Sequence, residues 1–234
     1  NIIDAAENNK KVVMMGFNLR HAPVLTRLKA IIDAGTIGRI MMIENREFYC
    51  GGRTYMARWN RRYELCGGLW IHKGSHDFDI FNWLLGFPKP VRVSSFANNS
   101  VFLPDQIPFK VPSGLTVGPT CGECQCKHLC PDVFEHTAPE WNGEAVKCDN
   151  YHKDLCLYLS DKNVHDSGIA IVEYENGVRA SHLECFVTSI SDRLYTVIGD
   201  RGQIEVSLHH QTIKIIPRWD GEIVTYKLPE LVGG

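Results

Sequence analysis

The chain has 234 residues, of which 44% are hydrophobic and 22% are charged, and its formal net charge is −2. These values are typical of a globular protein with one large or two small domains. The near-neutral charge indicates no binding of nucleic acid or of an anionic membrane, and no apolar run approaches the ~20 residues of a membrane span. No signal peptide opens the sequence, so we expect a cytoplasmic protein.

The two ends of the sequence look incomplete. Residues 1–9 (NIIDAAENN) have the apolar spacing of a helix, but no N-cap residue precedes them. The last residues, LPELVGG, end in a loop pattern. We therefore expect a fragment, in which residues 1–10 end a helix from a missing N-terminal domain and residues 11–234 form one substrate-binding and oligomerisation domain.

The first elements of that domain follow in chain order. Residues 11–17 (KVVMMGF) form a short, continuous apolar run, which predicts a buried strand. Helical periodicity over residues 23–35 starts near a proline and ends at a glycine, as helices commonly do. Residues 39–50 predict a long strand. Residues 51–66, which are rich in glycine, arginine and aromatic residues, predict a loop of the kind that often carries function.

A second core helix is predicted within residues 67–86, and strands dominate the sequence after it. Asn176-Gly177 between alternating runs predicts a hairpin. Residues 98–165 have little periodicity and are rich in Pro, Gly, Cys and His, so we expect an insertion held by something other than a core. The fold class is α+β, an open and mainly antiparallel sheet with helices on one face, with strands at 91–97, 167–186, 193–207, 212–217 and 222–228.

The second helix carries His72, His76, Asp79 and Trp83 along one stripe of a helical wheel. Two histidines and a carboxylate at this spacing could bind zinc, as in a zinc hydrolase, although Lys73 stands where a zinc protease needs its glutamate. The imidazoles could instead be packing residues that hydrogen-bond to the backbone. A third interpretation is proton transfer by histidine near neutral pH, with Asp79 orienting the ring.

Six cysteines gather inside the insertion. A C-x-x-C pair with further cysteines about 20 residues later resembles the ligand set of a structural zinc site, and zinc would stabilise a segment that lacks a core. Free thiols, or disulfides formed after purification, are the alternatives. The candidate metal ligands are Cys121, Cys124, Cys126, Cys130, Cys148 and Cys156.

Four segments occur in an order that resembles one family of nicotinamide-dependent dehydrogenases. They are VVMMGFNLRHAPVLTRLKAIIDAGTIGRIMMI, GGLWIHKGSHDFDIFNWLLGFPKPVRVSSFA, VEYENGVRASHLECF and IGDRGQIEV. The sequence is similar to the glucose–fructose oxidoreductase, inositol dehydrogenase and rhizopine-catabolism (MocA) family. The resemblance covers most of the chain outside residues 98–165. It implies the C-terminal domain of the family, with the N-terminal Rossmann domain absent, since no G-x-G-x-x-G or Glu-Lys-Pro segment occurs.

The resemblance also implies roles for individual residues. His76 matches the histidine that moves a proton at the substrate hydroxyl, and His72 stands where the family often has an aspartate. Asp79 matches a family aspartate that follows the histidine by three residues, in or behind the substrate site. The other expected contacts are Asn18, Arg20 and Lys73 for the substrate, and Arg58 and Trp59 for the cofactor.

We therefore expect the substrate domain of an NAD- or NADP-dependent oxidoreductase acting on a sugar or cyclic polyol, inactive without its cofactor domain. The family's open sheet implies a homo-oligomer. A relative that cleaves glycosides with bound NAD, a zinc-dependent hydrolase and a non-catalytic binding module remain as alternatives.

Overall fold

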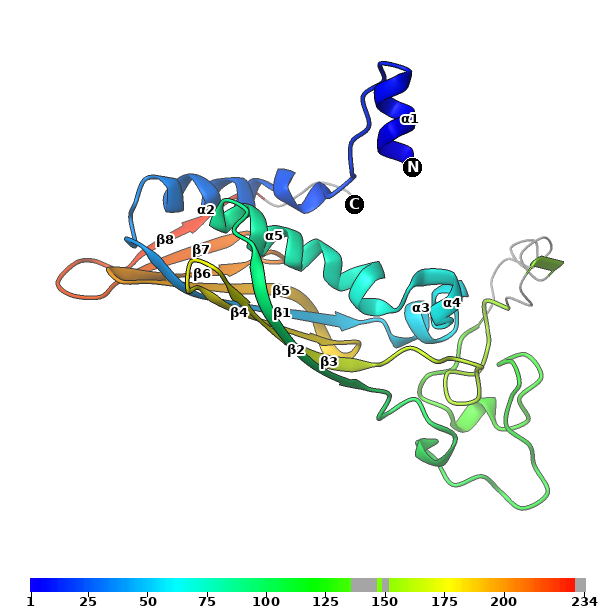
Figure 1. Ribbon diagram of the computed structural model, residues 1–234. Helices are drawn as coiled ribbons and strands as arrows, with labels where there is room; N and C mark the ends of the chain where they lie inside the picture. Colours follow the sequence, from blue (N-terminus) through cyan, green and yellow to red (C-terminus); the bar gives the residue numbers. More distant parts are fainter. Residues whose placement is uncertain (136–146, 149–151, 230–234) are drawn as a thin grey trace.

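The structure is a computed structural model that describes residues 1–135, 147–148 and 152–229. Its centre is one open sheet, in which β1 and β4 are parallel and every other neighbouring pair is antiparallel (Figure 1). This confirms the predicted α+β class. The order across the sheet is β2 (Pro90–Asn98), β3 (Ser167–Tyr174), β4 (Arg179–Cys185), β1 (Ile40–Cys50), β5 (Val187–Gly199), β6 (Gly202–Ser207), β7 (Thr212–Pro217) and β8 (Val224–Lys227).

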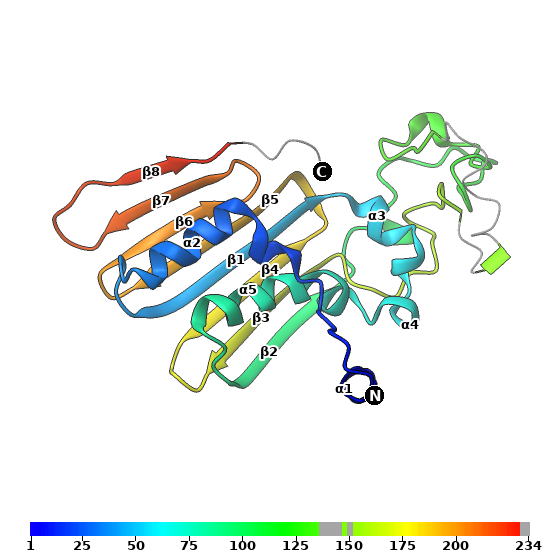
Figure 2. The same cartoon turned by 90° about the horizontal axis from the view of Figure 1, so that it is seen from above.

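Two helices, α2 (Pro23–Asp33) and α5 (Ser75–Leu85), lie side by side on one face of this sheet (Figure 2). The opposite face carries no described helix (Figure 1). Proline begins α2, where its missing N–H costs nothing, and Gly86 follows α5 with a φ of 79°, which glycine adopts without strain. The short elements are α1 (Ile2–Asn8), η1 (Asn18–His21), α3 (Gly52–Met56), η2 (Trp59–Arg61), α4 (Tyr63–Cys66), η4 (Pro104–Gln106) and η5 (Lys127–Leu129).

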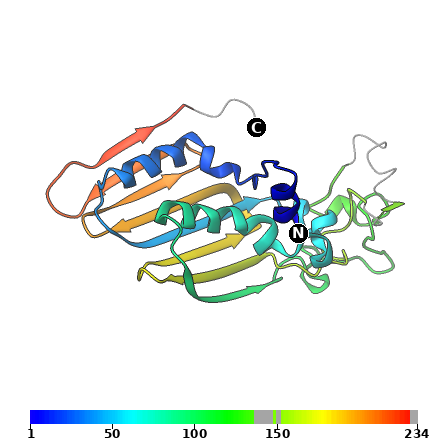
Figure 3. The ribbon, with the colours of Figure 1, turned by 45° about the horizontal axis from the view of Figure 1, so that its top comes forward.

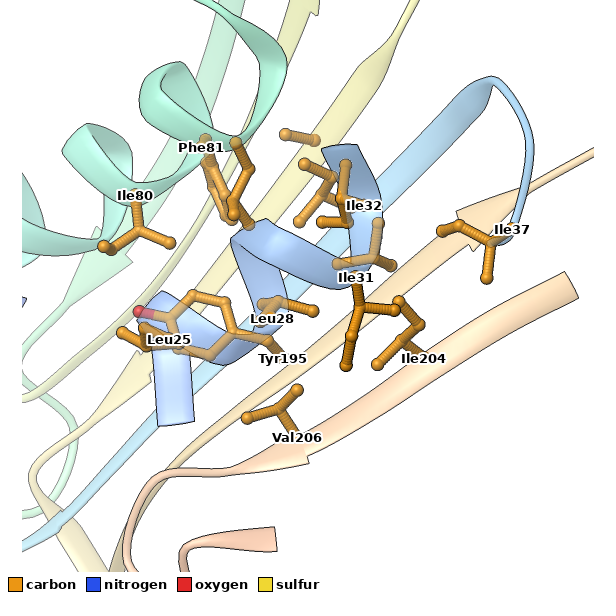
Figure 4. Packing of buried hydrophobic residues seen from close by; sticks show 14 of the residues in the cluster. Leu25, Leu28, Ile31, Ile32, Ile37, Ile80, Phe81, Tyr195, Ile204 and Val206 are labelled. Carbon is orange, nitrogen blue, oxygen red and sulfur yellow. The ribbon is translucent and has the colours of Figure 1, made fainter. Parts of the chain in front are cut away.

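The main core fills the space between these two helices and the sheet. Apolar residues at helical spacing on α2 and α5 contact every second residue of the central strands, because alternate strand side chains point to the same face (Figure 4). The largest fully buried members of this core are Leu25, Leu28, Ile37, Ile43, Ile80, Phe81, Tyr195, Ile204 and Ile213.

A second hydrophobic cluster holds the insertion against the end of the sheet, beside α3 and α4 (Figure 3). Met56 and Leu69 contribute from the first half of the chain, and Phe102, Leu157 and Tyr158 contribute from the insertion itself. The expectation of a segment without a core is therefore wrong for its described part. The isolated apolar residues near residue 157 have no period, which is why the sequence did not indicate this packing.

Residues 11–17 differ from their prediction. They form no strand, and the exposed fractions of Val12 and Met14 are 97% and 77%. An apolar run indicates strand propensity, but a strand needs a neighbour for its backbone hydrogen bonds, and no described strand lies beside this run. At the start of α1, the Asn1 side chain accepts a hydrogen bond from the Asp4 N–H. No helix in the described ranges is long and apolar enough to cross a membrane.

Candidate functional site

A cavity of about 530 Å³ opens beside the ends of β1 and β5 and the turn between β6 and β7. Its wall contains charged side chains of both signs, together with two histidines of the turn. A polar, partly open cavity of this size is suited to a hydroxylated small molecule. The lining groups that bear or gain charge are Glu47, Lys73, Asp192, Arg193, His209, His210 and Lys227.

Behind this cavity lies a buried cluster of charges. Arg193 forms ion pairs with Glu47 and with Asp77, whose Oδ1 is 3.2 Å from Arg193 Nε. Tyr195 donates a hydrogen bond of 2.6 Å to the same Asp77 oxygen. Lys73 Nζ lies 3.5 Å from Glu47 Oε1. Two carboxylates therefore face two cations, and this balance allows charges to stay in a site from which most water is excluded.

Burial has a larger effect on the pKa of Glu47 than the neighbouring charges have. Only 2% of Glu47 is exposed, and this burial raises its pKa to about 7, although Arg193 and Lys73 favour the ionised form. Glu47 can therefore exchange a proton near neutral pH. A carboxyl that is half protonated can donate or accept a hydrogen bond to a ligand in the cavity.

His76 lies on the first turn of α5, half-buried, with its ring 5.8 Å from that of Phe17 in an edge-to-face arrangement. Its Nδ1 is buried without a hydrogen-bond partner among the described residues. Burial and, next, the cation of Arg193 lower the pKa of His76 below the ordinary 6.5. The lowered pKa favours the neutral ring at pH 7, and the unpartnered nitrogen is a candidate proton acceptor. His76 directly precedes Asp77 of the buried charge cluster and is not itself among the residues that line the cavity.

His72 does not continue the stripe of His76. It lies in a π-helical turn, Trp70–Gly74, directly before α5, and such a turn changes the angular spacing on which the helical wheel depends. His72 faces the loop after β1, with its ring 5.3 Å from that of Trp59 and Asn60 Nδ2 3.4 Å from its Nε2. Burial lowers the pKa of His72 as well. The two histidines thus face different surroundings.

Two other predicted residues contact each other. Arg20 and Asp79 form an ion pair through both carboxylate oxygens, one of them at 2.7 Å from Arg20 Nε. Their charges are mutually satisfied, so this pair holds the segment before α2 against α5. Asn18 and Arg58 are exposed, and Trp59 covers His72 at the loop. The expected substrate and cofactor contacts of these residues stay predictions.

The metal sites expected from the sequence are not supported. Within the described ranges, no three or more His, Cys, Asp or Glu side chains are placed to hold a metal ion. The described residues therefore support neither the set of His72, His76 and Asp79 nor the cysteine set as a metal site. The cysteines act as packing groups or surface thiols instead, all of them free: Cys121, Cys126 and Cys156 are buried, Cys124 and Cys130 are half-buried, and Cys148 is exposed.

A second buried network supports the π-helical turn from below. His182 Nδ1 faces Asn45 Oδ1 at 2.5 Å and its Nε2 faces Glu184 Oε2 at 3.2 Å, while His165 pairs with the other Glu184 oxygen. A Cβ added to Gly74 would lie 3.2 Å from Glu184, so the turn rests directly on this network. A larger residue at Gly74 would displace the turn that carries Lys73.

Apart from Lys73, the residues of both networks were not expected from the sequence, although strand parity indicates those that lie on strands. Along β1, Asn45 and Glu47 alternate with exposed residues in the same phase as buried Ile43. His182 and Glu184 share the phase of buried Ala180 on β4. A polar residue at a position where alternation predicts burial needs a partner, and several such residues on neighbouring strands indicate a site.

Comparisons with known proteins agree with the sequence resemblance. A family model described as "oxidoreductase family, C-terminal alpha/beta domain" matches residues 29–222. A protein of Bacillus subtilis (strain 168) named "Putative oxidoreductase YteT" is 27% identical over 228 residues, which cover 92% of this chain and 52% of that protein. The chain thus spans about half the length of the curated relative that it matches.

Solved structures share the fold. Levoglucosan dehydrogenase in complex with NADH and levoglucosan superposes with a TM-score of 0.63 at 15% identity, over 96% of this chain and 49% of that one. UDP-N-acetylglucosamine 3-dehydrogenase of Acidithiobacillus ferrooxidans gives a TM-score of 0.57 at 16% identity, over 95% and 49%. At this identity the likeness establishes the fold alone.

Proposed function

The chain belongs to the oxidoreductase family of glucose–fructose oxidoreductase, inositol dehydrogenase and MocA, as its C-terminal α/β domain, and from this premise we propose that it is the substrate-binding part of an NAD- or NADP-dependent dehydrogenase. The proposed substrate is a sugar or a cyclic polyol. Structural neighbours that are sugar dehydrogenases, one of them with NADH and its sugar bound, support this class. The polar cavity beside Glu47, Lys73 and Arg193 is consistent with a ligand rich in hydroxyl groups.

In this proposal His76 takes the proton from the substrate hydroxyl that is oxidised. The observation that carries this role is its buried, unpartnered Nδ1 on a ring kept neutral by burial and by Arg193. Lys73 and Glu47 would hold the other hydroxyls of the substrate, since both line the cavity and are already oriented by their ion pair. His72, behind Trp59, would shape the loop side of the site.

The described residues do not by themselves fit the cofactor. A dinucleotide binds at the carboxyl ends of parallel strands, next to a glycine-rich turn that opens a helix. Here β1 and β4 form the single parallel pair of the described sheet, and α3 after β1 has five residues. We therefore expect the dinucleotide to be held by another part of the protein, and this chain alone to be inactive.

We also propose that the chain self-associates through the face of the sheet that the helices leave uncovered. Phe96, Ile169 and Ile171 on β2 and β3, together with Met42 on β1, are exposed on this face, with exposed fractions of 76%, 40%, 51% and 47%. Apolar patches on an open sheet usually mark a protein interface. On the same face of β1, next to Met42, Glu44 and Arg46 form an ion pair with each other.

The test of the proposed activity uses the full-length protein that carries this chain. NAD(P)H absorbance is followed with a panel of sugars and inositols, for the unchanged protein, for His76→Ala and for the matched control His128→Ala, which changes an exposed histidine. We expect turnover that falls about 10²–10⁴-fold in His76→Ala and not in the control. Equal turnover in all three proteins would remove His76 from the site. Absence of any turnover, with NAD(H) bound, would reject the net dehydrogenase.

A further inference from the structure

A second cavity, of about 640 Å³, lies on the other side of the π-helical turn from the first. Trp70 and Ile71 of that turn line it, whereas Lys73 of the same turn lines the first cavity. Its remaining walls come from the Gly67-Gly68 bend, the end of β2 and the end of the insertion. The volume is that of an ordinary small-molecule site, and neither the family match nor the proposed activity accounts for it.

The wall of this second cavity carries a cation without a counter-charge. Lys162 is half-buried, and among the described residues its Nζ hydrogen-bonds to the Tyr158 carbonyl at 3.4 Å and to the Ser160 hydroxyl at 3.5 Å. Both distances are at the outer limit of a hydrogen bond. Burial lowers the pKa of Lys162, although the neighbouring carboxylates of Asp166 and Asp161 favour its charged form.

The carboxylates nearest to Lys162 are engaged elsewhere. Asp161 forms ion pairs with Arg61 and Arg62. Asp166 accepts hydrogen bonds from the backbone N–H groups of Ser100 and Val101 and from the Ser167 hydroxyl. Of the ion pairs among described residues, none includes Lys162. The cavity therefore offers a positive charge that a ligand could neutralise.

The other walls indicate the body of such a ligand. Tyr63 and Trp70 provide aromatic surface, and Asn98 and Asn99 line the same cavity. Asn98 Oδ1 accepts from the Asn99 N–H and Asn99 Nδ2 donates to the Val164 carbonyl, whereas Asn99 Oδ1 has no hydrogen-bond partner among the described residues. Aromatic rings next to hydrogen-bonding amides suit a hydroxylated ring, which has apolar C–H faces and polar edges. His165 completes the wall, with its Nε2 already paired to Glu184.

We propose that this cavity binds a small sugar acid, with the carboxylate at Lys162 and the hydroxylated ring against Tyr63, Trp70 and the two asparagines. A ligand here contacts the turn whose other side carries Lys73, and it lies next to His165 and so to the network under Gly74. The site is distinct from the proposed substrate cavity and does not depend on the proposed activity.

The test is calorimetric titration of the chain with D-glucuronate, D-glucose and acetate. D-glucuronate should bind, and D-glucose and acetate should each bind at least about tenfold more weakly, because each lacks one half of the ligand. Lys162→Met and Lys162→Gln should each weaken D-glucuronate binding about tenfold or more. Lys110→Met, at an exposed lysine, should leave it unchanged. Lys73→Met reports separately on any binding of D-glucuronate in the first cavity.

Four results would overturn the proposal. If D-glucose bound as tightly as D-glucuronate, the carboxylate would contribute nothing to binding. If acetate bound as tightly as D-glucuronate, the hydroxylated ring would contribute nothing. Binding that survives both Lys162 variants but is lost in Lys73→Met would place the ligand in the first cavity. No binding of D-glucuronate to a chain whose thermal unfolding is cooperative would leave the second cavity without this ligand. The assay needs no turnover, so its failure is separable from failure of the dehydrogenase proposal.

Discussion

Arg20 and Asp79 lie 59 positions apart in the sequence and form a two-point ion pair between the segment before α2 and the second turn of α5. The exposed fraction of the Asp79 side chain is 6% and that of Arg20 is 30%. Phe17, three residues before Arg20, packs its ring against His76. The ion pair therefore fixes the chain segment that covers the proposed catalytic histidine.

Replacing Asp79 by Asn should lower the free energy of unfolding by about 2 kcal/mol, because the Arg20 guanidinium would lose its charged partner. Chemical denaturation of the chain measures this change. The control is Glu173→Gln, which breaks the exposed pair with Arg92 and should leave stability unchanged. Equal effects of the two substitutions would show that the Arg20–Asp79 pair contributes no more than a surface contact.

Glu47→Gln should change how stability depends on pH. The pKa of Glu47 is about 7 in the folded chain and has the ordinary value of 4.5 in the unfolded chain. Between these two pH values the folded chain binds more protons than the unfolded chain. The contribution of Glu47 to stability therefore falls as pH rises from about 4.5 to 7. The full difference corresponds to about 3 kcal/mol.

The measurement for Glu47→Gln is thermal unfolding of both proteins from pH 5 to pH 8. The stability of the unchanged chain relative to the variant should decline across this range. A constant difference at every pH would mean that Glu47 has an ordinary pKa in the folded protein.

The activity of the full-length protein should depend on pH through His76. Its pKa is lowered below the ordinary 6.5, so protonation of the ring should produce a decrease in kcat/KM at a pH below that value. His76→Ala should remove this acidic limb together with most of the activity. An acidic limb that persists unchanged in the variant would assign it to another group.

Ile171→Lys should weaken self-association, because it places a charge in the middle of the uncovered apolar face of the sheet. The expected effect is a rise of about tenfold or more in the dissociation constant, measured by light scattering over a range of protein concentrations. Ile223→Lys is the matched control, because Ile223 has a similar exposure of 59% but lies before β8. A chain that is monomeric without any substitution would contradict the proposed interface.

Treatment with a metal chelator should leave the melting temperature of the chain unchanged, because no group of three or more described His, Cys, Asp or Glu side chains is placed to hold a metal ion. Cys126 is fully buried, so Cys126→Ser should destabilise the chain by about 1–3 kcal/mol through the buried hydroxyl. Cys148→Ser changes an exposed thiol and should have no effect. Loss of stoichiometric zinc together with a lower melting temperature would restore the zinc interpretation.

The sheet was the most predictable part of the structure, because strand alternation and the Asn176-Gly177 turn are local properties of the chain. The sequence also indicated His76, through the family resemblance, and the helix that carries it. It did not indicate the π-helical turn that moves His72 away from the stripe of His76, since such a turn depends on the packing beneath Gly74.

The buried charge cluster could not be predicted from the sequence, because it depends on which strands pair. Glu47 and Arg193 each look like an ordinary surface residue in a list of charges, and their meaning lies in the pairing of β1 with β5, where they stand opposite each other. The prediction of a buried strand at residues 11–17 was wrong for the opposite reason. A local apolar pattern predicted burial, but burial depends on a tertiary neighbour, and no described strand lies beside this run. Local patterns thus predicted elements well and predicted contacts poorly.

The parallel pairing of β1 with β4 has a consequence for how the chain folds. β1 occupies the middle of the sheet, yet both of its neighbours come from the last third of the sequence: Asn45 and His182, in contact across the parallel pair, are 137 positions apart. During synthesis β1 must therefore wait, unpaired, until β4 and β5 have emerged. Closing so long a loop is slow, and the backbone amides of β1 should gain protection from hydrogen exchange only in the final step of folding.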